Sequence, residues 1–231
     1  MKLGAPVRPV DAAGLILLRG ARDAPEILLG RRHAKTAFLP DIYVVPGGRV
    51  DPDDHLPSGF RERLHPAVEQ ALRIGNGRRP PLAFLRGALR ELHEETGLVL
   101  ASPGSGKARA TPVWQAYARA GCAPDFGGFD FLLRAITPVE SRRRYNTRFF
   151  LGDGSTAIGD IRGNGELLDL RWRTLEELDS LTIVDVTWAL IRLALARWRE
   201  RVPVGGESPK LLIYRNNSLV LRPLRSAGRR V

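Results

Sequence analysis

The stretch "RELHEETGL", residues 90–98, places three glutamates within five positions directly before a glycine. At about 100° per residue of an α-helix, Glu91, Glu94 and Glu95 share one sector about 100° wide, away from the leucines that precede them. Like charges at this spacing repel one another, and the last turn of a helix disfavours negative charge. Magnesium or manganese removes that repulsion and prefers oxygen ligands. The pattern therefore indicates either a metal site or an ordinary acidic helix face.

Two neighbouring features favour the metal site. Arg90 lies next to Glu91 and four residues before Glu94, so that it can orient a carboxylate without occupying the place of the cation. Upstream, "PGG" (46–48) ends an extended stretch with two residues that lack side chains. A glycine carbonyl at that point can approach a cation closely.

The remaining pattern predicts one compact α/β domain over residues 1–231, because apolar runs of strand length alternate with amphipathic helices. The longest helix is expected at 183–201, and the glutamate helix should begin at Pro80-Pro81 and end at Gly97. The expected strands lie at 12–19, 26–31, 42–48, 129–136, 145–151 and 167–172, with further helices within 51–80 and at 113–120, and a hairpin at 210–224 turning at Asn216-Asn217.

The residues of this stretch carry a family resemblance. "RELHEETGL" matches the second half of the Nudix box, Arg-Glu-apolar-x-Glu-Glu-x-Gly-apolar, and "PGG" resembles the glycine pair that opens it. Nudix hydrolases cleave nucleoside diphosphates linked to another group, with a divalent metal. The resemblance implies an α/β/α sandwich around a mixed β-sheet. It also implies that Glu91, Glu94, Glu95 and the Gly47 carbonyl bind Mg²⁺ or Mn²⁺, and that Arg90 orients the carboxylates.

The box is interrupted in this chain. From Gly48 to Arg90 the chain is about 28 residues longer than in the uninterrupted box, with the insert placed at about 51–80. The family's further glutamate, eight residues before the arginine, falls at Leu82, which cannot replace it.

A subgroup that includes the mammalian peroxisomal coenzyme A diphosphatases is interrupted in a similar way. This resemblance implies coenzyme A or an acyl-coenzyme A as the leading substrate. ADP-ribose, dinucleotides and nucleoside triphosphates remain alternatives, as does a non-catalytic Nudix domain that senses a nucleotide.

Hydrolysis of a diphosphate also needs a general base and groups that hold phosphate. Glu166 is the candidate base, Glu94 and the other box glutamates are alternatives, and Asp153, Asp160 and Asp169 compete with them. Arginine forks hold phosphate oxygens in pairs. The candidate phosphate-binding residues are Arg31, Arg32, Arg144 and Arg148.

Composition narrows the choice of partner. The net charge of +11 comes from 32 arginines and 4 lysines spread along the chain, which favours an anionic small molecule over nucleic acid. An enzyme directed at capped RNA ends is favoured by the charge alone. Because Cys122 is the single cysteine, an internal disulfide is excluded and a cytoplasmic location is expected. No apolar run is long enough to predict a membrane span, and a homodimer is compatible with the sequence.

Overall fold

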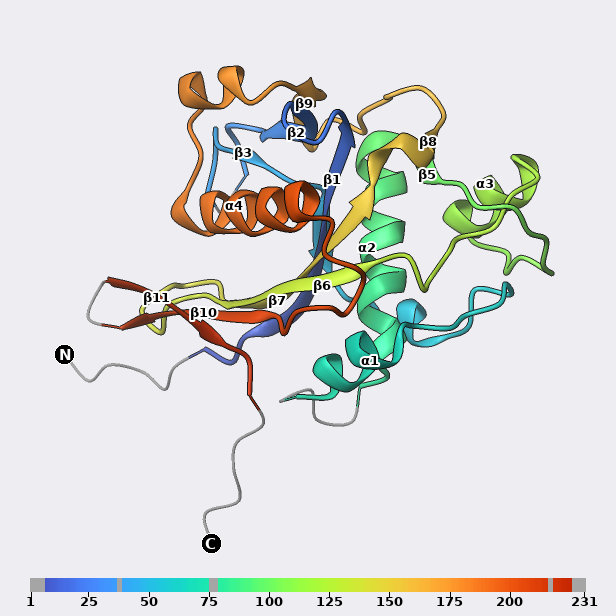
Figure 1. The fold of residues 1–231 in the computed structure, drawn as a ribbon, viewed down its shortest axis with the longest axis horizontal. Coiled ribbons are helices and arrows are strands. Elements are labelled where there is room, and N and C mark those ends of the chain that lie inside the picture. Colours follow the sequence, from blue (N-terminus) through green and yellow to red (C-terminus); the bar gives the residue numbers. More distant parts are fainter. Residues whose placement is uncertain (1–6, 37–38, 75–78, 216–217, 226–231) are drawn as a thin grey trace, which may run out of the picture.

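The computed structural model describes residues 7–36, 39–74, 79–215 and 218–225 (Figure 1). Its centre is β1 (Val10–Gly20), which pairs in parallel with β7 (Tyr145–Asp153) along most of its length. The opposite edge of β1 is shared between two antiparallel partners. β4 (Gly47–Arg49) pairs with the beginning of β1, and β2 (Pro25–Arg32) pairs with its end.

The other strands extend this mixed sheet in both directions. Its order is β11-β10-β6-β7-β1-β2-β3, with β4 added beside β1 and β9 beside β2. Parallel pairs (β1 with β7, β10 with β6) occur together with antiparallel ones, as predicted for a mixed sheet. The bounds are β3 (Tyr43–Val44), β6 (Asp130–Ile136), β9 (Leu167–Arg173), β10 (Lys210–Arg215) and β11 (Ser218–Pro223), and a separate pair is formed by β5 (Val99–Leu100) and β8 (Ala157–Ile158).

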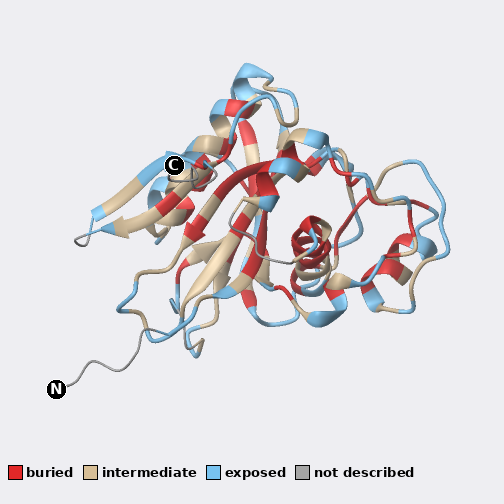
Figure 2. Cartoon of the chain, turned by 90° about the horizontal axis from the view of Figure 1, so that it is seen from below, coloured by how far each residue is buried: buried red, intermediate tan, exposed pale blue. Residues whose placement is uncertain are grey.

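Helices cover both faces of the sheet. On one face α2 (Pro81–Thr96) packs with Leu15 and Leu17 of β1, and α1 (Pro66–Arg73) and α3 (Pro112–Arg119) lie beside it (Figure 1). On the other face α4 (Asp185–Glu200) packs with Ile16 and Leu18. Since both faces of β1 are covered, its apolar run is continuous rather than alternating. The buried residues accordingly concentrate in the central strands and in α2 (Figure 2).

The glutamate helix begins and ends where the sequence predicts. Pro81 occupies its first turn, where the missing amide costs no hydrogen bond. Gly97 closes it in the left-handed conformation, with φ of 78°, and its amide donates to the carbonyl of His93. The last turn therefore holds Glu94 and Glu95 in a fixed position relative to the sheet.

The insert follows its predicted helix only in part. The sequence predicted a helix within 51–80, where Phe60, Leu64, Val68 and Leu72 recur at helical spacing. Of these, α1 (Pro66–Arg73) includes only Val68 and Leu72, and a short 3₁₀ helix, η1 (Pro52–His55), precedes it. Proline fixes its own φ at a helical value and pushes the preceding residue into an extended conformation, so the helix begins at Pro66. Phe60 is buried all the same, without belonging to a helix.

The C-terminal elements match the prediction closely. α4 has 16 residues, as many as α2, and so is not the longest helix. β10 and β11 pair as a hairpin, and its predicted turn at residues 216–217 lies outside the described residues. Within the described part of the chain, the structure contains no helix long and apolar enough to cross a membrane.

Candidate active site

A cavity of about 840 Å³ opens where the edge of β1 passes from β4 to β2. One end of it is acidic, because α2 contributes the glutamates of its last two turns and the loop before β9 contributes another. The lining at this acidic end consists of Arg32, Gly47, Gly48, Arg49, Asp51, Arg90, Glu91, Glu94, Glu95 and Glu166. The three box glutamates and the predicted base therefore share one cavity, as the sequence analysis expected.

Arg90 connects these groups. Its Nη1 donates to Glu91 Oε1 at 2.9 Å and to Glu94 Oε2 at 2.8 Å, and its Nη2 donates to the carbonyl of Arg49 at 2.9 Å. The Nε and Nη2 atoms donate to Oδ1 and Oδ2 of Asp54, each at 3.0 Å. Burial lowers the pKa of Arg90, but Asp54 and the glutamates outweigh it and raise this pKa above its ordinary value. Arg90 therefore stays charged and holds two carboxylates in place.

Asp54 is the functional residue that the sequence analysis missed. Counted eight residues back from Arg90, the position of the family's further glutamate falls at Leu82. Counted six residues forward from Gly48, the same position falls at Asp54. The interruption therefore lies after the acidic position of the box rather than before it. The Asp54 side chain is 4% exposed, and both of its oxygens accept hydrogen bonds from Arg90. Its Oδ2 also accepts a hydrogen bond from the Asp51 amide at 2.8 Å.

Glu91 approaches the sheet at Gly48. A Cβ atom on Gly48 would lie 2.4 Å from Glu91 Oε1, so no larger residue fits while this carboxylate is in place. Burial raises the pKa of the Glu91 carboxyl to about 7; Arg90 opposes the rise, and the nearby Glu94 and Glu166 add to it. A carboxylate so placed is an unstable anion until a cation joins it.

The other glycine of the pair, Gly47, positions Glu95. The Gly47 amide donates to Glu95 Oε2 at 2.8 Å, and a Cβ on Gly47 would lie 2.6 Å from the carbonyl oxygen of Ala13. Burial raises the pKa of Glu95 to about 8. The hydrogen bond from Gly47 lowers this pKa, and the charges of Glu91 and Glu166 raise it further. The glycine pair thus allows strand and helix to approach closely enough for both carboxylates to reach the cavity.

Arg32 and Glu166 reach the site together, because β2 pairs with β9 and Arg32 lies opposite Leu167. The His33 amide also donates to the carbonyl of Glu166 at 3.2 Å. The effect of Glu166 on the pKa values of Glu91 and Glu95 shows that its charge lies near both. The Arg32 Nε is buried and has no hydrogen-bond partner among the described residues. Since Arg32 lines the cavity, its guanidinium is a candidate donor to an anion bound there.

The donor set suits a hard divalent cation. The carboxylates of Glu91, Glu94 and Glu95 supply oxygen ligands, and burial disfavours the charged forms of Glu91 and Glu95 until a cation offsets that charge. Within the described residues, no group of three or more His, Cys, Asp or Glu side chains is gathered tightly enough to enclose an ion. Arg90 bonds to two of these carboxylates, so binding of a cation requires Glu94, the more exposed of the two, to turn away from it.

The remaining predicted arginines do not line this cavity. Arg31 donates to Asp41 at 2.7 Å, and Arg144 donates to the backbone carbonyls of Thr137 and Val7. Neither Arg31 nor Arg144, both candidates for binding phosphate, is therefore positioned at the cavity.

Arg148 faces the opposite side of the sheet from the cavity. Its side chain is 1% exposed and lies 4.0 Å from the centre of the Phe84 ring of α2, and it donates to Asp11 at 2.8 Å. Burial, assisted by the nearby Arg134, lowers its pKa to about 10. The sequence showed the alternation along β7, but not which of the two faces the cavity would occupy.

The competing aspartates also lie outside the cavity. Asp153 caps a short 3₁₀ helix, η2 (Gly154–Thr156), by accepting from the Ser155 amide, and Asp160 pairs with Arg162 on the exposed surface. Asp169 accepts from Tyr43 at 2.6 Å, and this bond lowers the pKa of its carboxyl. Glu166 is thus the acidic residue of this region that the cavity includes.

No family model matches the chain. The acyl-coenzyme A diphosphatase NUDT19 of Gallus gallus is 28% identical over 204 residues, covering 61% of this chain and 54% of that protein. The chain therefore spans about half the length of the curated relative that it matches.

A solved structure shares the fold. A NUDIX hydrolase from Alicyclobacillus acidocaldarius superposes with a TM-score of 0.60 at 29% identity, covering 83% of this chain and 93% of that one. A MutT NUDIX hydrolase from Burkholderia pseudomallei has a TM-score of 0.46 at 18% identity, with coverages of 82% and 98%. The mixed sheet between two helical layers is the α/β/α sandwich of the first of these structures. In its fold, its motif and these relatives the chain resembles the Nudix hydrolases, and among them an acyl-coenzyme A diphosphatase.

Proposed function

We propose that this chain hydrolyses the phosphoanhydride of a nucleoside diphosphate derivative, with Mg²⁺ or Mn²⁺ as cofactor and coenzyme A or an acyl-coenzyme A as the leading substrate. The observation that carries the proposal is the acidic end of the cavity. Three box glutamates, Glu166 and the unpaired Nε of Arg32 meet there, beside a space large enough for a nucleotide.

Glu91, Glu94 and Glu95 would hold the cation, together with the Gly47 carbonyl. A bound divalent cation lowers the pKa of a water molecule and neutralises charge on the phosphate oxygens. Arg90 would keep the carboxylates in position, and Arg32 would hold a phosphate oxygen from the opposite side of the cavity. Arg31, Arg144 and Arg148 have other partners in the structure, so we assign them no contact with the substrate.

Glu166 would accept the proton of the attacking water. It is exposed on the cavity wall and close enough to Glu91 and Glu95 to affect their pKa values. Glu94, which is 42% exposed, is the alternative base. A Glu166→Gln variant separates the two, because loss of the base lowers kcat by about 10²- to 10⁴-fold and removes the acidic limb of the pH profile, where the rate falls as the base takes up a proton.

The preference for coenzyme A derivatives is supported by the interrupted box and by the relative described as an acyl-coenzyme A diphosphatase. ADP-ribose and other nucleoside diphosphate derivatives are the alternatives. All of them share the diphosphate that the acidic end would bind, so the proposed chemistry does not depend on this choice.

The test is a panel of coenzyme A, acetyl-coenzyme A, ADP-ribose and diadenosine compounds, each with Mg²⁺ and with Mn²⁺. We expect cleavage at the diphosphate, and a loss of at least about 10³-fold in kcat for Glu94→Gln and Glu95→Gln, since several kcal/mol of charge stabilisation depend on the metal. Glu69→Gln is the matched control, because Glu69 is a half-exposed glutamate of α1 outside the cavity.

Cleavage that persists in both box variants would contradict the metal assignment. If the wild-type chain binds these compounds tightly but cleaves none of them with either metal, the chain is a nucleotide sensor and the proposed hydrolysis is wrong.

A further inference from the structure

The cavity has a second end, built from elements that the Nudix box does not include. It extends from the acidic end over β7 and β10 to the beginning of α4. Its wall combines aromatic rings and hydroxyl groups, the main contributors being Tyr145, Thr147, Phe149, Asp185, Thr187 and Tyr214.

The two ends differ in charge. Every cation that lines the cavity within the described residues (Arg32, Arg49 and Arg90) lies at the acidic end. At the second end the charged residue is Asp185, in the first turn of α4. Its carboxylate also offsets the partial positive charge that a helix presents at its N-terminus. A second phosphate group would find no counter-charge there.

Phe149 supplies a flat apolar surface. Its ring lies against the backbone of β1 at Gly14, where a Cβ atom would lie 2.8 Å from the Cδ1 and Cε1 atoms of the ring. Glycine at this position therefore keeps the ring against the sheet and out of the cavity. Phe149 remains partly exposed although it belongs to the sheet, since the side of the ring away from β1 faces the cavity.

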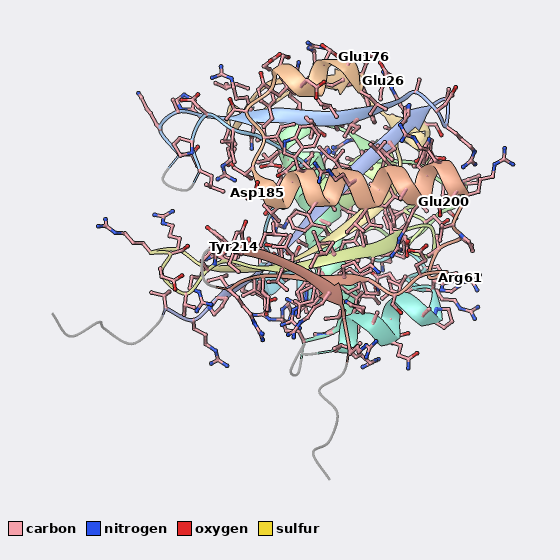
Figure 3. All side chains as sticks on the ribbon, turned by 60° about the vertical axis from the view of Figure 1, so that its left-hand side comes forward. Glu26, Arg61, Glu176, Asp185, Glu200 and Tyr214 are labelled. Atoms are coloured by element: carbon pink, nitrogen blue, oxygen red, sulfur yellow. The ribbon has the colours of Figure 1, made fainter. Side chains whose placement is uncertain are left out.

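Asp185 and Tyr214 form a polar rim at the mouth of this end. Asp185 begins α4 and Tyr214 comes from β10, and the two labelled side chains lie on the same side of the molecule (Figure 3). Burial raises the pKa of Tyr214, and the negative charge of Asp185 contributes to the rise. A carboxylate beside a phenol offers hydrogen-bond acceptors to a ligand that carries N–H groups.

We infer that the second end of the cavity binds an uncharged, N–H-bearing part of the substrate, with Phe149 as its apolar seat and Asp185 and Tyr214 as its hydrogen-bonding rim. This inference rests on the proposed function for the position of the diphosphate. A purine base and the amide chain of pantetheine share the required chemistry. Either one would leave the phosphates at the acidic end, and a phosphate on the bound group itself would oppose binding.

The test uses fragments and needs no hydrolysis. Dissociation constants of adenosine, adenosine 3′-monophosphate and pantetheine are measured by NMR on the full chain in EDTA. We expect at least one uncharged fragment to bind, and adenosine to bind more tightly than its phosphorylated form, adenosine 3′-monophosphate, which carries a phosphate on the bound group itself. The fragment that binds identifies which of the two sources of this chemistry the site takes.

Two variants and one control complete the design. Asp185→Lys and Tyr214→Ala should each weaken binding of the uncharged fragment at least about fivefold, which is the effect of one lost hydrogen bond. Asp185→Lys should also reduce or reverse the preference against the phosphorylated form. Glu200→Lys carries the same change of charge at the far end of α4, about 22 Å away at 1.5 Å per residue, and should change neither (Figure 3).

The inference is wrong if neither uncharged fragment binds, or if Asp185→Lys and Tyr214→Ala bind it as the wild type does. Because Asp185 is exposed, its variant tests the inference even if Tyr214→Ala disturbs the hairpin. If the chain cleaves none of the diphosphates in the panel but still binds the fragment, the proposed hydrolysis is wrong and the inferred binding site stands.

Discussion

At the scale of single residues, the site depends on how buried charges are paired. Arg90 neutralises two glutamates and is itself held by Asp54, whose side chain is almost fully buried. Glu95 has its hydrogen bond from a backbone amide instead, and burial raises its pKa to about 8, so its charged form is not stabilised by the protein alone. The acidic end is therefore ordered before a metal arrives, but it is not electrostatically satisfied.

Replacing Asp54 tests this ordering. In Asp54→Asn, Arg90 loses its fixed partner and should shift toward Glu91 and Glu94, so we expect kcat to fall about 10- to 100-fold, as is typical for outer-shell partners of metal ligands. KM should change little, and Asp54→Glu should recover part of the rate. Steady-state kinetics on the best substrate of the panel measures both. Asp53→Asn, an exposed neighbour paired with Arg109, is the control, and full activity in Asp54→Asn would exclude a positioning role.

The raised carboxyl pKa values predict how stability depends on pH when the metal is chelated. Glu91 and Glu95 have pKa values of about 7 and about 8 in the folded chain, above their ordinary value. The folded state then binds more protons than the unfolded state between about pH 4.5 and pH 8, so the unfolding free energy falls as pH rises through this range. Melting curves in EDTA at pH 5 and pH 8 should show this loss. Glu95→Gln should reduce it, and a wild-type Tm that rises over the same interval would contradict the assignment.

At the scale of elements, the site is a close contact between α2 and β4. The insert reinforces α2 from outside, because Glu62 pairs with Arg86 one turn before Arg90, and both side chains are buried. On the inner side, the two glycines of β4 allow the contact, each in a different way. A Cβ on Gly48 would meet the end of a side chain, whereas a Cβ on Gly47 would meet backbone.

These two glycines give a matched pair of variants. Gly48→Ala should displace the flexible Glu91 carboxylate, so we expect metal affinity to fall about tenfold while Tm changes little. Gly47→Ala would bring Cβ within 2.6 Å of the Ala13 carbonyl oxygen and of the Gly14 Cα. Overpacking against backbone should lower the unfolding free energy by about 1–3 kcal/mol. Metal titration and chemical denaturation of both variants measure the contrast, and equal behaviour of the two would refute it.

At the scale of the whole molecule, Asp11 joins three parts of the chain. Arg148 of β7 and Arg79 of the insert both pair with its carboxylate at the beginning of β1, on the face that α2 covers. Arg148 therefore contributes to the assembly of sheet, insert and helix, on the opposite face from the cavity.

Arg148→Ala should accordingly affect stability rather than binding. Removing one partner of a buried ion pair costs about 3–5 kcal/mol, so a large fall in the unfolding free energy is expected. KM and kcat should stay within about twofold at a temperature where the variant is folded. Arg144→Ala, which removes contacts to backbone carbonyls only, is the comparison. A raised KM with unchanged stability would instead favour the substrate contact that the sequence suggested.

The fold and the acidic half of the site were predictable because both depend on local patterns. Apolar periodicity located β1, α2 and α4, and three glutamates on one helical face located the carboxylates. Asp54 was missed because a long insert separates it from Arg90, so that sequence distance concealed a direct contact.

The second end of the cavity could not be predicted for a different reason. Phe149, Asp185 and Tyr214 come from three elements whose relative positions follow from sheet order rather than from any local pattern. Alternation along β7 showed that Arg148 and Phe149 face opposite ways, but only the packing of α2 and α4 decides which of them meets the cavity.

The wall that Tyr214 provides also has a consequence for biosynthesis. The ribosome synthesises a protein from its N-terminus to its C-terminus, so all four glutamates of the acidic end emerge well before β10. A nascent polypeptide that stops after β9 would carry every proposed metal ligand and still lack one side of the compartment that receives the substrate. Emergence of β10, rather than appearance of the motif, would then mark the moment at which the protein can begin to select what it binds.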